Sequence, residues 1–397
     1  MEGVPDPPSG TSSAGTSSEE TGSSLTGPAR TRSALARRLA ARPPRSIGIV
    51  MLSAIGDAVH VLPVANALKR RWPDTRITWI IQPVPHMLVR NHRAIDDFIL
   101  FRRRRGLEAW KGFAELGAEV RSRHFDVVLA LQVYFKAGII TGLLSADIKL
   151  GFDRRRARDL NWIFTDEKIP PGPNQHVQDQ YFEFVEHMGV SPEPVEWGIE
   201  LTPAEEEDQS RFFAEVDGPV CAVVVGTSKK EKNWTPEGYA RVLDQAHVRH
   251  GLQPVLVGGP SAVERAIADE ILARSRAPVV DTLGDDLRRL VWILDGAALT
   301  LSPDTGPLHI SRALDTPVVG LYGYTNPKRT GPYRKYTDLV VDGYAREPGE
   351  DYPVSMEYRD GMSRVTPEAV LEKVDRAMDR YVNPSTTASG ARDRASP

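Results

Sequence analysis

Short apolar runs alternate with amphipathic segments along most of the chain, and this alternation predicts parallel β-sheets with helical crossovers. In the first half, β-rich runs are followed by segments whose apolar residues recur at spacings of three and four. The pattern predicts strands at residues 46–53, 77–81, 98–101 and 125–131, and helices at residues 58–71, 110–123 and 177–188.

The same alternation begins again near residue 201. It predicts strands at residues 220–225, 253–257, 299–301 and 317–322, and helices at residues 262–274, 287–294, 306–314 and 367–381. A further helix is expected to open at Thr235 and Pro236, an N-cap followed by proline at the first helical position. The economical architecture is an α/β fold of two Rossmann-like, doubly wound domains facing a cleft and joined near residues 190–202. Ligands of such sheets bind at the carboxyl ends of the strands, so the strand-to-helix loops are the candidate sites.

The domain boundaries follow from composition. Residues 1–45 are expected to form a disordered extension, because residues 1–27 are mostly Gly, Ser, Thr and Pro. The first domain is placed at residues 46–195 and the second at residues 196–382. Residues 383–397 are expected to be a disordered tail.

The basic stretch at residues 30–45 holds six arginines around an Ala/Leu segment. It is either a solvated linker or a short basic helix lying on an anionic membrane face. The acidic start lacks an apolar core, which argues against a signal peptide. With no run of about 18 apolar residues, no membrane span is expected. These features predict a cytoplasmic protein and leave peripheral attachment to the inner face of the membrane open.

Overall composition narrows the function classes. The 397 residues are 41% hydrophobic and 26% charged, which is enough apolar material for two cores. A net charge of −3 argues against a nucleic-acid-binding protein with a uniformly basic surface. Cys221 is the one cysteine, so a disulfide framework and a multi-thiolate metal site are excluded.

The first candidate loop follows the strand at residues 46–53 and contains Gly56 and Asp57. Gly56 allows a tight turn, and Asp57 stands at the start of the next helix. One interpretation of Asp57 is a helix N-cap, for which its acceptor oxygens and charge are favourable. The other is a carboxylate that faces the cleft as a general base.

The second candidate loop follows a buried strand and runs from Gly226 to Trp234. The hydroxyls of Thr227 and Ser228 precede three lysines within four positions, the last of them Lys232. Hydroxyl and ammonium groups in this place suit a diphosphate, although the sequence has no Walker pattern. A solvated charged loop is the alternative.

Two further loops of the second half offer polar contacts. Thr305 and Gly306 place free backbone amides at a helix N-terminus, which favours anions. Asp304 beside them either holds sugar hydroxyls or caps the helix. Glu264, after Gly258-Gly259-Pro260, is either a ligand for ribose hydroxyls or an exposed helix residue.

Three segments together resemble bacterial glycosyltransferase family 9, the ADP-heptose:lipopolysaccharide heptosyltransferases. They are SAIGDAVHVLPVANALKRRWPDTRITWI, TSKKEKNWTPEGYARVL and SPDTGPLHISRALDTPVVGLYGYTNPKRTGPY. The resemblance covers roughly residues 46–381. It implies the GT-B fold, an inverting reaction without metal or other cofactor, and a last helix that crosses back to the first domain. The implied donor is ADP-heptose and the implied acceptor a lipid A–Kdo inner core at the membrane surface. A monomer without a nucleic-acid partner is expected.

The resemblance also implies roles for residues of this sequence. Asp57 matches the family's proposed catalytic base. Lys232 matches the lysine that contacts the donor diphosphate, and Thr227 and Ser228 match its hydroxyl neighbours.

Further donor contacts are implied in the second half. Asp304, Thr305 and Gly306 match the Asp-Thr-Gly that meets the donor sugar and pyrophosphate. His309 lies one helical turn further on and is either a ligand or a packing residue. Glu264 matches a nucleotide-binding glutamate.

Acceptor contacts are expected at Gly56, Arg154 and Arg158. The run at residues 151–158 resembles a family segment that holds a basic acceptor contact, and a solvated loop is its alternative. The sequence departs from the family in its N-terminal extension and in Lys229-Lys230-Glu231, where acidic residues are more usual. Another nucleotide-sugar donor, or a binding protein without catalysis, therefore stays an alternative.

Overall fold

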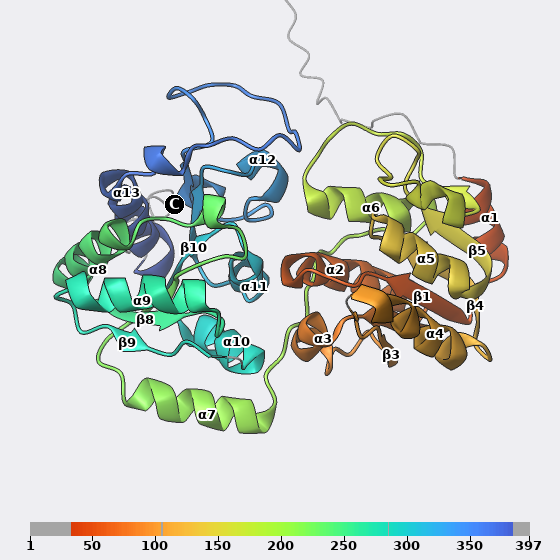
Figure 1. Cartoon of the computed structure of the whole chain (residues 1–397), viewed down its shortest axis with the longest axis horizontal. Coiled ribbons are helices and arrows are strands. Elements are labelled where there is room, and N and C mark those ends of the chain that lie inside the picture. The colour runs from red at the N-terminus through yellow and green to blue at the C-terminus, as the bar shows by residue number, and fades with distance from the viewer. Residues whose placement is uncertain (1–32, 105, 285, 384–397) are drawn as a thin grey trace, which may run out of the picture. The chain divides into compact units, whose positions relative to one another are not determined.

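The computed structural model describes residues 33–104, 106–284 and 286–383, and the described part belongs to one compact unit that begins at Ser33. It contains two six-stranded parallel sheets, each covered by helices on both faces (Figure 1). This architecture confirms the predicted α/β fold with two doubly wound sheets.

The first sheet has the strand order β3-β2-β1-β4-β5-β6. Its strands are β1 Ser46–Val50, β2 Arg76–Ile81, β3 Asp97–Leu100, β4 His124–Ala130, β5 Ser145–Gly151 and β6 Glu167–Lys168. Its helices are α1 Ala34–Ala41, α2 Ile55–Arg71, α3 Pro83–Val89, α4 Ala109–Val120, α5 Phe135–Leu143 and α6 Val177–His187. Two 3₁₀ turns accompany them, η1 Gly106–Glu108 and η2 Asn161–Phe164.

The second sheet repeats this topology in the order β12-β11-β10-β7-β8-β9. Its strands are β7 Val220–Val224, β8 Gln253–Val257, β9 Val280–Asp281, β10 Leu299–Pro303, β11 Val318–Tyr322 and β12 Val340–Asp342. Its helices are α7 Pro203–Ala214, α8 Pro236–His250, α9 Ala262–Arg274, α10 Leu287–Gly296, α11 Gly306–Ala313, α12 Pro327–Thr330 and α13 Pro367–Ala377. Short helical turns lie at η3 Lys230–Lys232, η4 Thr337–Leu339, η5 Met362–Arg364 and η6 Met378–Val382.

In each sheet, successive strands are added first on one side of the starting strand and then on its other side. β1 pairs in parallel with both β2 and β4, and β7 pairs in parallel with both β8 and β10. The loops after β1 and β4 therefore diverge to opposite faces and leave a crevice at the carboxyl ends, and the same holds for β7 and β10. Both switch points are thus available for a ligand.

The cores of the first sheet follow the two-residue period of its strands. Ile47 and Ile49 of β1 pack on one face in the cluster that contains α2 and α6. Val50 packs on the other face with residues of α4 and α5. Burial on both faces explains why β1 reads as a continuous apolar run.

Helix α1 corrects the prediction for the stretch that precedes the first domain. Residues 1–45 were expected to be disordered, and residues 1–32 lie outside the described part, but Ala34–Ala41 is helical. Its Leu35 and Leu39 are buried in the first core, and a Cβ at Gly189 would lie 2.9 Å from the Cβ of Ala36. The apolar face of α1 is therefore used for packing. It is neither a solvated linker nor free to lie on a membrane.

The last helix also differs from its expectation. It was expected to cross back to the first domain, but α13 packs on α8, β11 and β12 of the second half. Tyr381 in the following turn donates to Asp338 of the same half at 2.8 Å. The predicted tail at residues 383–397 lies outside the described residues except for Asn383.

Arg288 connects the two halves and the segment between them. The guanidinium of this α10 residue donates twice to the carboxylate of Glu205 in α7, at 2.7 Å each. It also donates to the carbonyl of Leu88 in α3, at 3.1 Å, and to the carbonyl of Glu200, at 2.7 Å. The side chain of Arg288 is 7% exposed, so water screens these bonds little.

Replacing Arg288 tests how much it contributes to the free energy of unfolding. We expect Arg288→Met to lower the free energy of unfolding by about 3 kcal/mol near neutral pH, because Glu205 is left with a buried unpaired charge. Hydrogen bonds from Arg288 lower the pKa of Glu205 to about 2, so the stabilisation is present above the ordinary pKa and is lost as the pH falls. The deficit should therefore shrink from pH 6 to pH 3 in urea denaturation. Arg274→Met, which removes an exposed pair, is the control, and a deficit independent of pH would contradict the assignment.

Candidate functional site

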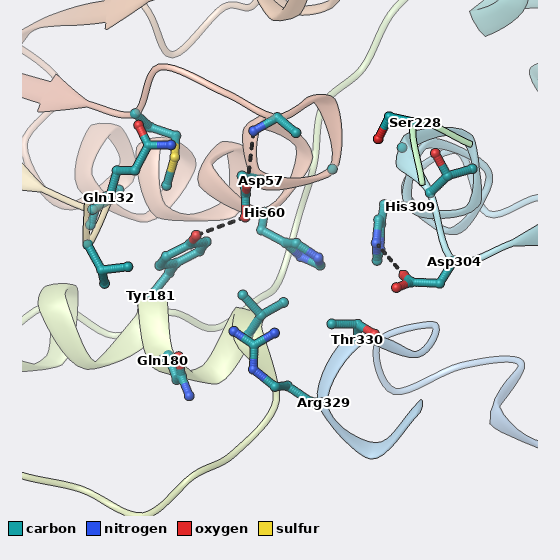
Figure 2. Close-up of a pocket in the computed structure, with 18 of the residues that line it drawn as sticks. Asp57, His60, Gln132, Gln180, Tyr181, Ser228, Asp304, His309, Arg329 and Thr330 are labelled. Atoms are coloured by element: carbon teal, nitrogen blue, oxygen red, sulfur yellow. Dashed lines mark hydrogen bonds and ion pairs between the residues drawn. The ribbon is translucent and has the colours of Figure 1, made fainter. Parts of the chain in front are cut away.

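A cavity of about 320 Å³ lies where the carboxyl ends of the two sheets meet. The loops after β1, β4, β7 and β10 all contribute to its wall, so both topological switch points open into one space. Helix α6 and the segment around α12 complete the lining (Figure 2). The predicted site residues in the wall are Gly56, Asp57, Thr227, Ser228, Lys232, Asp304, Thr305, Gly306 and His309.

Asp57 occupies the third position of α2, and the N-cap of that helix is Ala54. The N-cap interpretation of Asp57 is therefore wrong, although its Oδ2 accepts the Ala54 N–H at 2.9 Å. Its Oδ1 accepts the hydroxyl of Tyr181 at 3.1 Å. Burial raises the pKa of Asp57 above its usual value, because it outweighs these two hydrogen bonds to the ionised form. The result is a carboxylate with raised proton affinity in the cavity wall.

Helices α2 and α11 approach each other with their N-terminal ends at this cavity. A Cβ at Gly56 would lie 2.7 Å from Cδ2 of His309, and a Cβ at Gly306 would lie 2.9 Å from Cβ of Ile55. Both distances are too short for a side chain, so the approach depends on glycine at both positions. The N-terminal amides of α11 at Thr305 and Gly306 thereby face the same space as Asp57.

Asp304 is the most strongly paired carboxylate of the site. Its Oδ2 accepts from Lys232 Nζ at 2.7 Å and from the Thr325 hydroxyl at 2.5 Å, and Nε2 of His309 lies 3.7 Å from Oδ1. Burial would raise the pKa of Asp304, but His309 and Lys232 outweigh it and hold that pKa well below its usual range. The N-cap of α11 is Thr305, so Asp304 does not cap the helix as one interpretation expected. Instead it positions the ammonium of Lys232.

The lysine loop is ordered by its own bonds. The backbone N–H of Thr227 donates to Asn233 Oδ1 at 2.8 Å, and the Thr227 hydroxyl donates to the carbonyl of Lys229 at 2.7 Å. The ammonium of Lys229 lies 4.7 Å from the ring centroid of Tyr358. The side chain of Lys232 is 18% exposed. The solvated-loop interpretation therefore fails for Lys232.

Glu264 lies outside the main cavity. Its carboxylate accepts the N–H of Gly259 at 2.8 Å and the hydroxyl of Ser261 at 2.6 Å. A second cavity of about 60 Å³ begins at the adjacent Gly258 and continues to Thr282. Glu264 is thus bound to its own loop at the edge of a separate small pocket.

The predicted acceptor arginines are not in the cavity wall either. The guanidinium of Arg154 lies 4.0 Å from the ring centroid of Trp162, and Nη2 of Arg158 contacts Met356 Sδ at 3.6 Å. Arg156, between them, pairs with Asp153 and Glu183 and is largely buried. The structure therefore does not bring this run together with Asp57, and its role in acceptor binding stays a prediction.

Several lining residues were not predicted from the sequence. Tyr181 lies within a helix predicted only from its apolar spacing, and Arg329 lies inside the GYTNPKRTGPY segment without an assigned role. His60 comes one turn after Asp57, and its ring centroid lies 4.6 Å from that of His309. Burial lowers the pKa of His60, so its ring is neutral in this setting. The sequence offered one signal for His60 as a cavity residue, its position one helical turn after the candidate base Asp57.

Two general properties of the described part complete the picture. Its His, Cys, Asp and Glu side chains form no group of three or more placed to hold a metal ion. Across the ranges that the structure describes, none of the helices is long and apolar enough to cross a membrane.

Comparison with known proteins places the chain among sugar transferases. The sequence model of glycosyltransferase family 9 (heptosyltransferase) matches residues 113–357. The chain is 31% identical over 306 residues to the lipopolysaccharide core heptosyltransferase OpsX of Haemophilus influenzae, across 76% of this chain and 86% of that protein. It is 25% identical over 341 residues to lipopolysaccharide heptosyltransferase 1 of Escherichia coli, across 82% of this chain and 98% of that protein.

Solved structures show the same fold. A glycosyl transferase of family 9 from Veillonella parvula superposes with a TM-score of 0.71 at 21% identity, over 85% of this chain and 97% of that one. The E. coli heptosyltransferase WaaC with ADP-2-deoxy-2-fluoro heptose superposes with a TM-score of 0.66 at 23% identity, over 83% and 99%. The expected GT-B fold is thereby confirmed.

The bond between Tyr181 and Asp57 gives a test of the site's electrostatics. The Tyr181 hydroxyl stabilises the ionised form of Asp57, so Tyr181→Phe should raise the pKa of this carboxyl further. The measurement is a carboxyl-carbon NMR titration of protein labelled at aspartate, with Asp57→Asn to assign the signal. Tyr134→Phe is the control, since Tyr134 lines the same cavity. An unchanged or lower pKa in Tyr181→Phe would contradict this geometry.

Proposed function

The chain belongs to glycosyltransferase family 9, and from this premise we propose that it is an inverting heptosyltransferase. Its proposed donor is ADP-heptose, and its proposed acceptor is a lipopolysaccharide inner core of lipid A–Kdo type. Relatives named as lipopolysaccharide heptosyltransferases support this choice of acceptor. The WaaC complex with an ADP-heptose analogue supports the choice of donor.

One observation carries the proposal: the cavity holds a carboxylate of raised pKa together with a helix N-terminus and a positioned lysine. Asp57 lies on the first half, and Lys232 with the amides of Thr305 and Gly306 lies on the second. A base and an anion site in one cavity are what transfer from a sugar diphosphate requires.

The proposed step begins at the acceptor hydroxyl. The carboxylate of Asp57 takes the proton of that hydroxyl while its oxygen attacks the anomeric carbon of the donor. The bond between the anomeric carbon and the diphosphate oxygen breaks, and ADP leaves on the opposite face, which inverts the configuration. The raised pKa of Asp57 suits this role, because a base works best when its pKa approaches the operating pH.

The leaving diphosphate gathers negative charge as the bond breaks. Lys232 and the backbone amides of Thr305 and Gly306 are proposed to stabilise that charge. Asp304 acts through Lys232, whose ammonium it holds at 2.7 Å. Because these groups already supply positive charge, we propose a reaction without a metal cofactor.

The remaining contacts are assigned by position. Glu264 lies beside the second cavity and is proposed to bind the ribose of the donor. Arg154 and Arg158 are proposed to bind acidic groups of the acceptor outside the main cavity, and Gly56 is proposed to leave room for the reacting end of the acceptor.

The protein is proposed to work as a monomer, peripheral to the cytoplasmic face of the membrane that holds the acceptor. The predicted domain boundaries at residues 46–195 and 196–382 are part of this proposal.

Removing the base tests the assignment. We expect Asp57→Asn to lower heptose transfer to a Kdo-containing acceptor by about 10²- to 10⁴-fold, because no other group is proposed to accept the proton. Donor binding should persist, measured as the rise in melting temperature with ADP-heptose. Asp74→Asn, an exposed carboxylate beyond the other end of α2, should keep full activity.

The same thermal measurement tests the donor. ADP-heptose should raise the melting temperature more than UDP-, GDP- or other ADP-sugars at equal concentration. A larger rise with another nucleotide sugar would favour a different family 9 transferase. Full transfer by Asp57→Asn would remove Asp57 as the base.

A further inference from the structure

Arg329 is a cation of the main cavity to which this scheme assigns no role. The cavity wall contains three cationic side chains, Lys229, Lys232 and Arg329. Lys232 is paired with Asp304, and Lys229 lies over the rings of Tyr324 and Tyr358. The Nε of Arg329 is buried and has no hydrogen-bond partner among the residues that the structure describes.

A buried donor without an acceptor is costly, so this arrangement favours an anion beside Arg329. Leaving one such group unsatisfied costs about 1–3 kcal/mol, and more when it is charged. A carboxylate can accept two parallel N–H bonds from a guanidinium, whereas the phosphates of the donor already have Lys232 and the helix amides. The unmet requirement is thus for a second oxyanion in the cavity.

The position of Arg329 indicates which substrate carries that oxyanion. The residue belongs to α12 of the second half, but Figure 2 shows its side chain on the side of α6, away from Asp304, and its charge acts on Tyr181 of α6. Its charge lowers the pKa of Asp57 and of His176, both in the first half. Arg329 therefore lies on the side where Asp57 would meet the acceptor hydroxyl.

We propose that Arg329 binds a carboxylate of the acceptor, next to the hydroxyl that Asp57 deprotonates. This proposal rests on the proposed function and makes it more specific, since it requires an acidic sugar at the reacting end of the acceptor. The guanidinium would also offset the repulsion between that carboxylate and Asp57. Because Arg329 belongs to the second half, the acceptor is held by both halves at once.

The experiment is a comparison of two variants with two acceptors. Arg329→Gln should raise the KM for the acceptor by about 10- to 100-fold, as expected for loss of a charge-assisted pair. The KM for ADP-heptose should stay within about two-fold of the wild type, because the guanidinium does not touch the donor. Lys328→Gln is the matched control, a neighbouring cation of α12 that pairs with Asp351 at the surface.

An acceptor whose carboxylate has been reduced to an alcohol completes the cycle. The wild type should lose as much affinity for this reduced acceptor as Arg329→Gln loses for the natural acceptor. Arg329→Gln should lose no further affinity when it is given the reduced acceptor, because both changes remove the same ion pair. Additive losses, or an unchanged acceptor KM in Arg329→Gln, would overturn the proposal. A raised KM for ADP-heptose in Arg329→Gln would assign Arg329 to the diphosphate instead. Absence of transfer by the wild type would contradict the proposed function itself, so the two failures are distinct.

A second, independent observation concerns the outer face of α5. Phe135, Ile139 and Leu143 recur at a spacing of four on this helix, and the first and last are 42% and 41% exposed. The adjoining turn η2 adds Ile163, and the residue directly before it adds Leu160; they are 52% and 58% exposed. We call these five residues the α5 surface. The turn and the helix lie against each other, because Phe164 of η2 packs on Phe135 and on the glycines of α5.

Cations adjoin the α5 surface although the chain as a whole is slightly acidic. Lys136 is exposed on α5, and Arg155 and Arg158 are exposed in the loop before η2. Arg154 lies over Trp162 within η2 itself. An apolar patch next to a basic rim is complementary to an anionic lipid bilayer, which offers acyl chains beneath negative headgroups.

We infer that the α5 surface docks on an anionic membrane. The inference rests on the proposed function, in which the acceptor is anchored in lipid. Tyr134, directly before α5, lines the main cavity, so docking through this helix brings the cavity next to the bilayer. A lipid-anchored acceptor then reaches Asp57 without leaving the membrane.

Vesicle co-sedimentation of the full chain tests this surface. The wild type should bind vesicles of phosphatidylcholine with phosphatidylglycerol, bind pure phosphatidylcholine weakly, and lose binding as salt rises. The triple variant Phe135→Ser/Leu143→Ser/Ile163→Ser should bind at least about 10-fold more weakly, since each serine removes exposed apolar area that would be buried in the bilayer. Val248→Ser, an exposed apolar residue of α8, is the control.

Activity on a deacylated, water-soluble acceptor separates docking from catalysis. The triple variant should keep that activity, which also shows that it is folded. Vesicle binding by the triple variant equal to that of the wild type would overturn the inference and assign binding to another part of the chain. So would failure of the wild type to bind anionic vesicles.

Discussion

The close approach of α2 and α11 is the constraint on which the site depends. Gly56 lies against His309, and Gly306 lies against Ile55, at distances that leave no room for a Cβ. Through this contact the loops after β1 and β10 open into one cavity. A base held by the first sheet and an anion site held by the second are thereby kept close enough to act on one pair of substrates.

Two carboxylates of the cavity are given opposite properties by their surroundings. Burial raises the pKa of Asp57, whereas His309 and Lys232 hold the pKa of Asp304 down. One is therefore suited to take a proton and the other to remain an anion that positions a lysine, a division of roles that depends on environment alone. Lys232 is paired with Asp304, and the charge of Arg329 acts on Asp57 from across the cavity without an ion pair.

Local sequence was sufficient for the central strands of both sheets and for most of the loops at their ends, but β5, β6, β9 and β12 were not predicted. β1, β7 and β10 are buried on both faces, so their apolar runs and the loops that follow could be located directly. Tyr181 and Arg329 could not, because they reach the cavity through tertiary packing of elements far apart in sequence. A helix at α1 was one of two interpretations, but its packing on the first core and on Gly189 was not predicted, because composition does not show such a contact. The resemblance to the family implied that the last helix crosses back to the first half. In this chain α13 packs on the second half instead.

The account's central claim is that acceptor and leaving group lie on opposite sides of the reacting carbon, between Asp57 and Lys232. The most direct measurement is the anomeric configuration of the product, read from one-bond carbon–proton couplings by NMR after transfer from ADP-heptose of known configuration. A product of opposite configuration to the donor is predicted. A product that retains the donor's configuration would contradict direct attack assisted by Asp57.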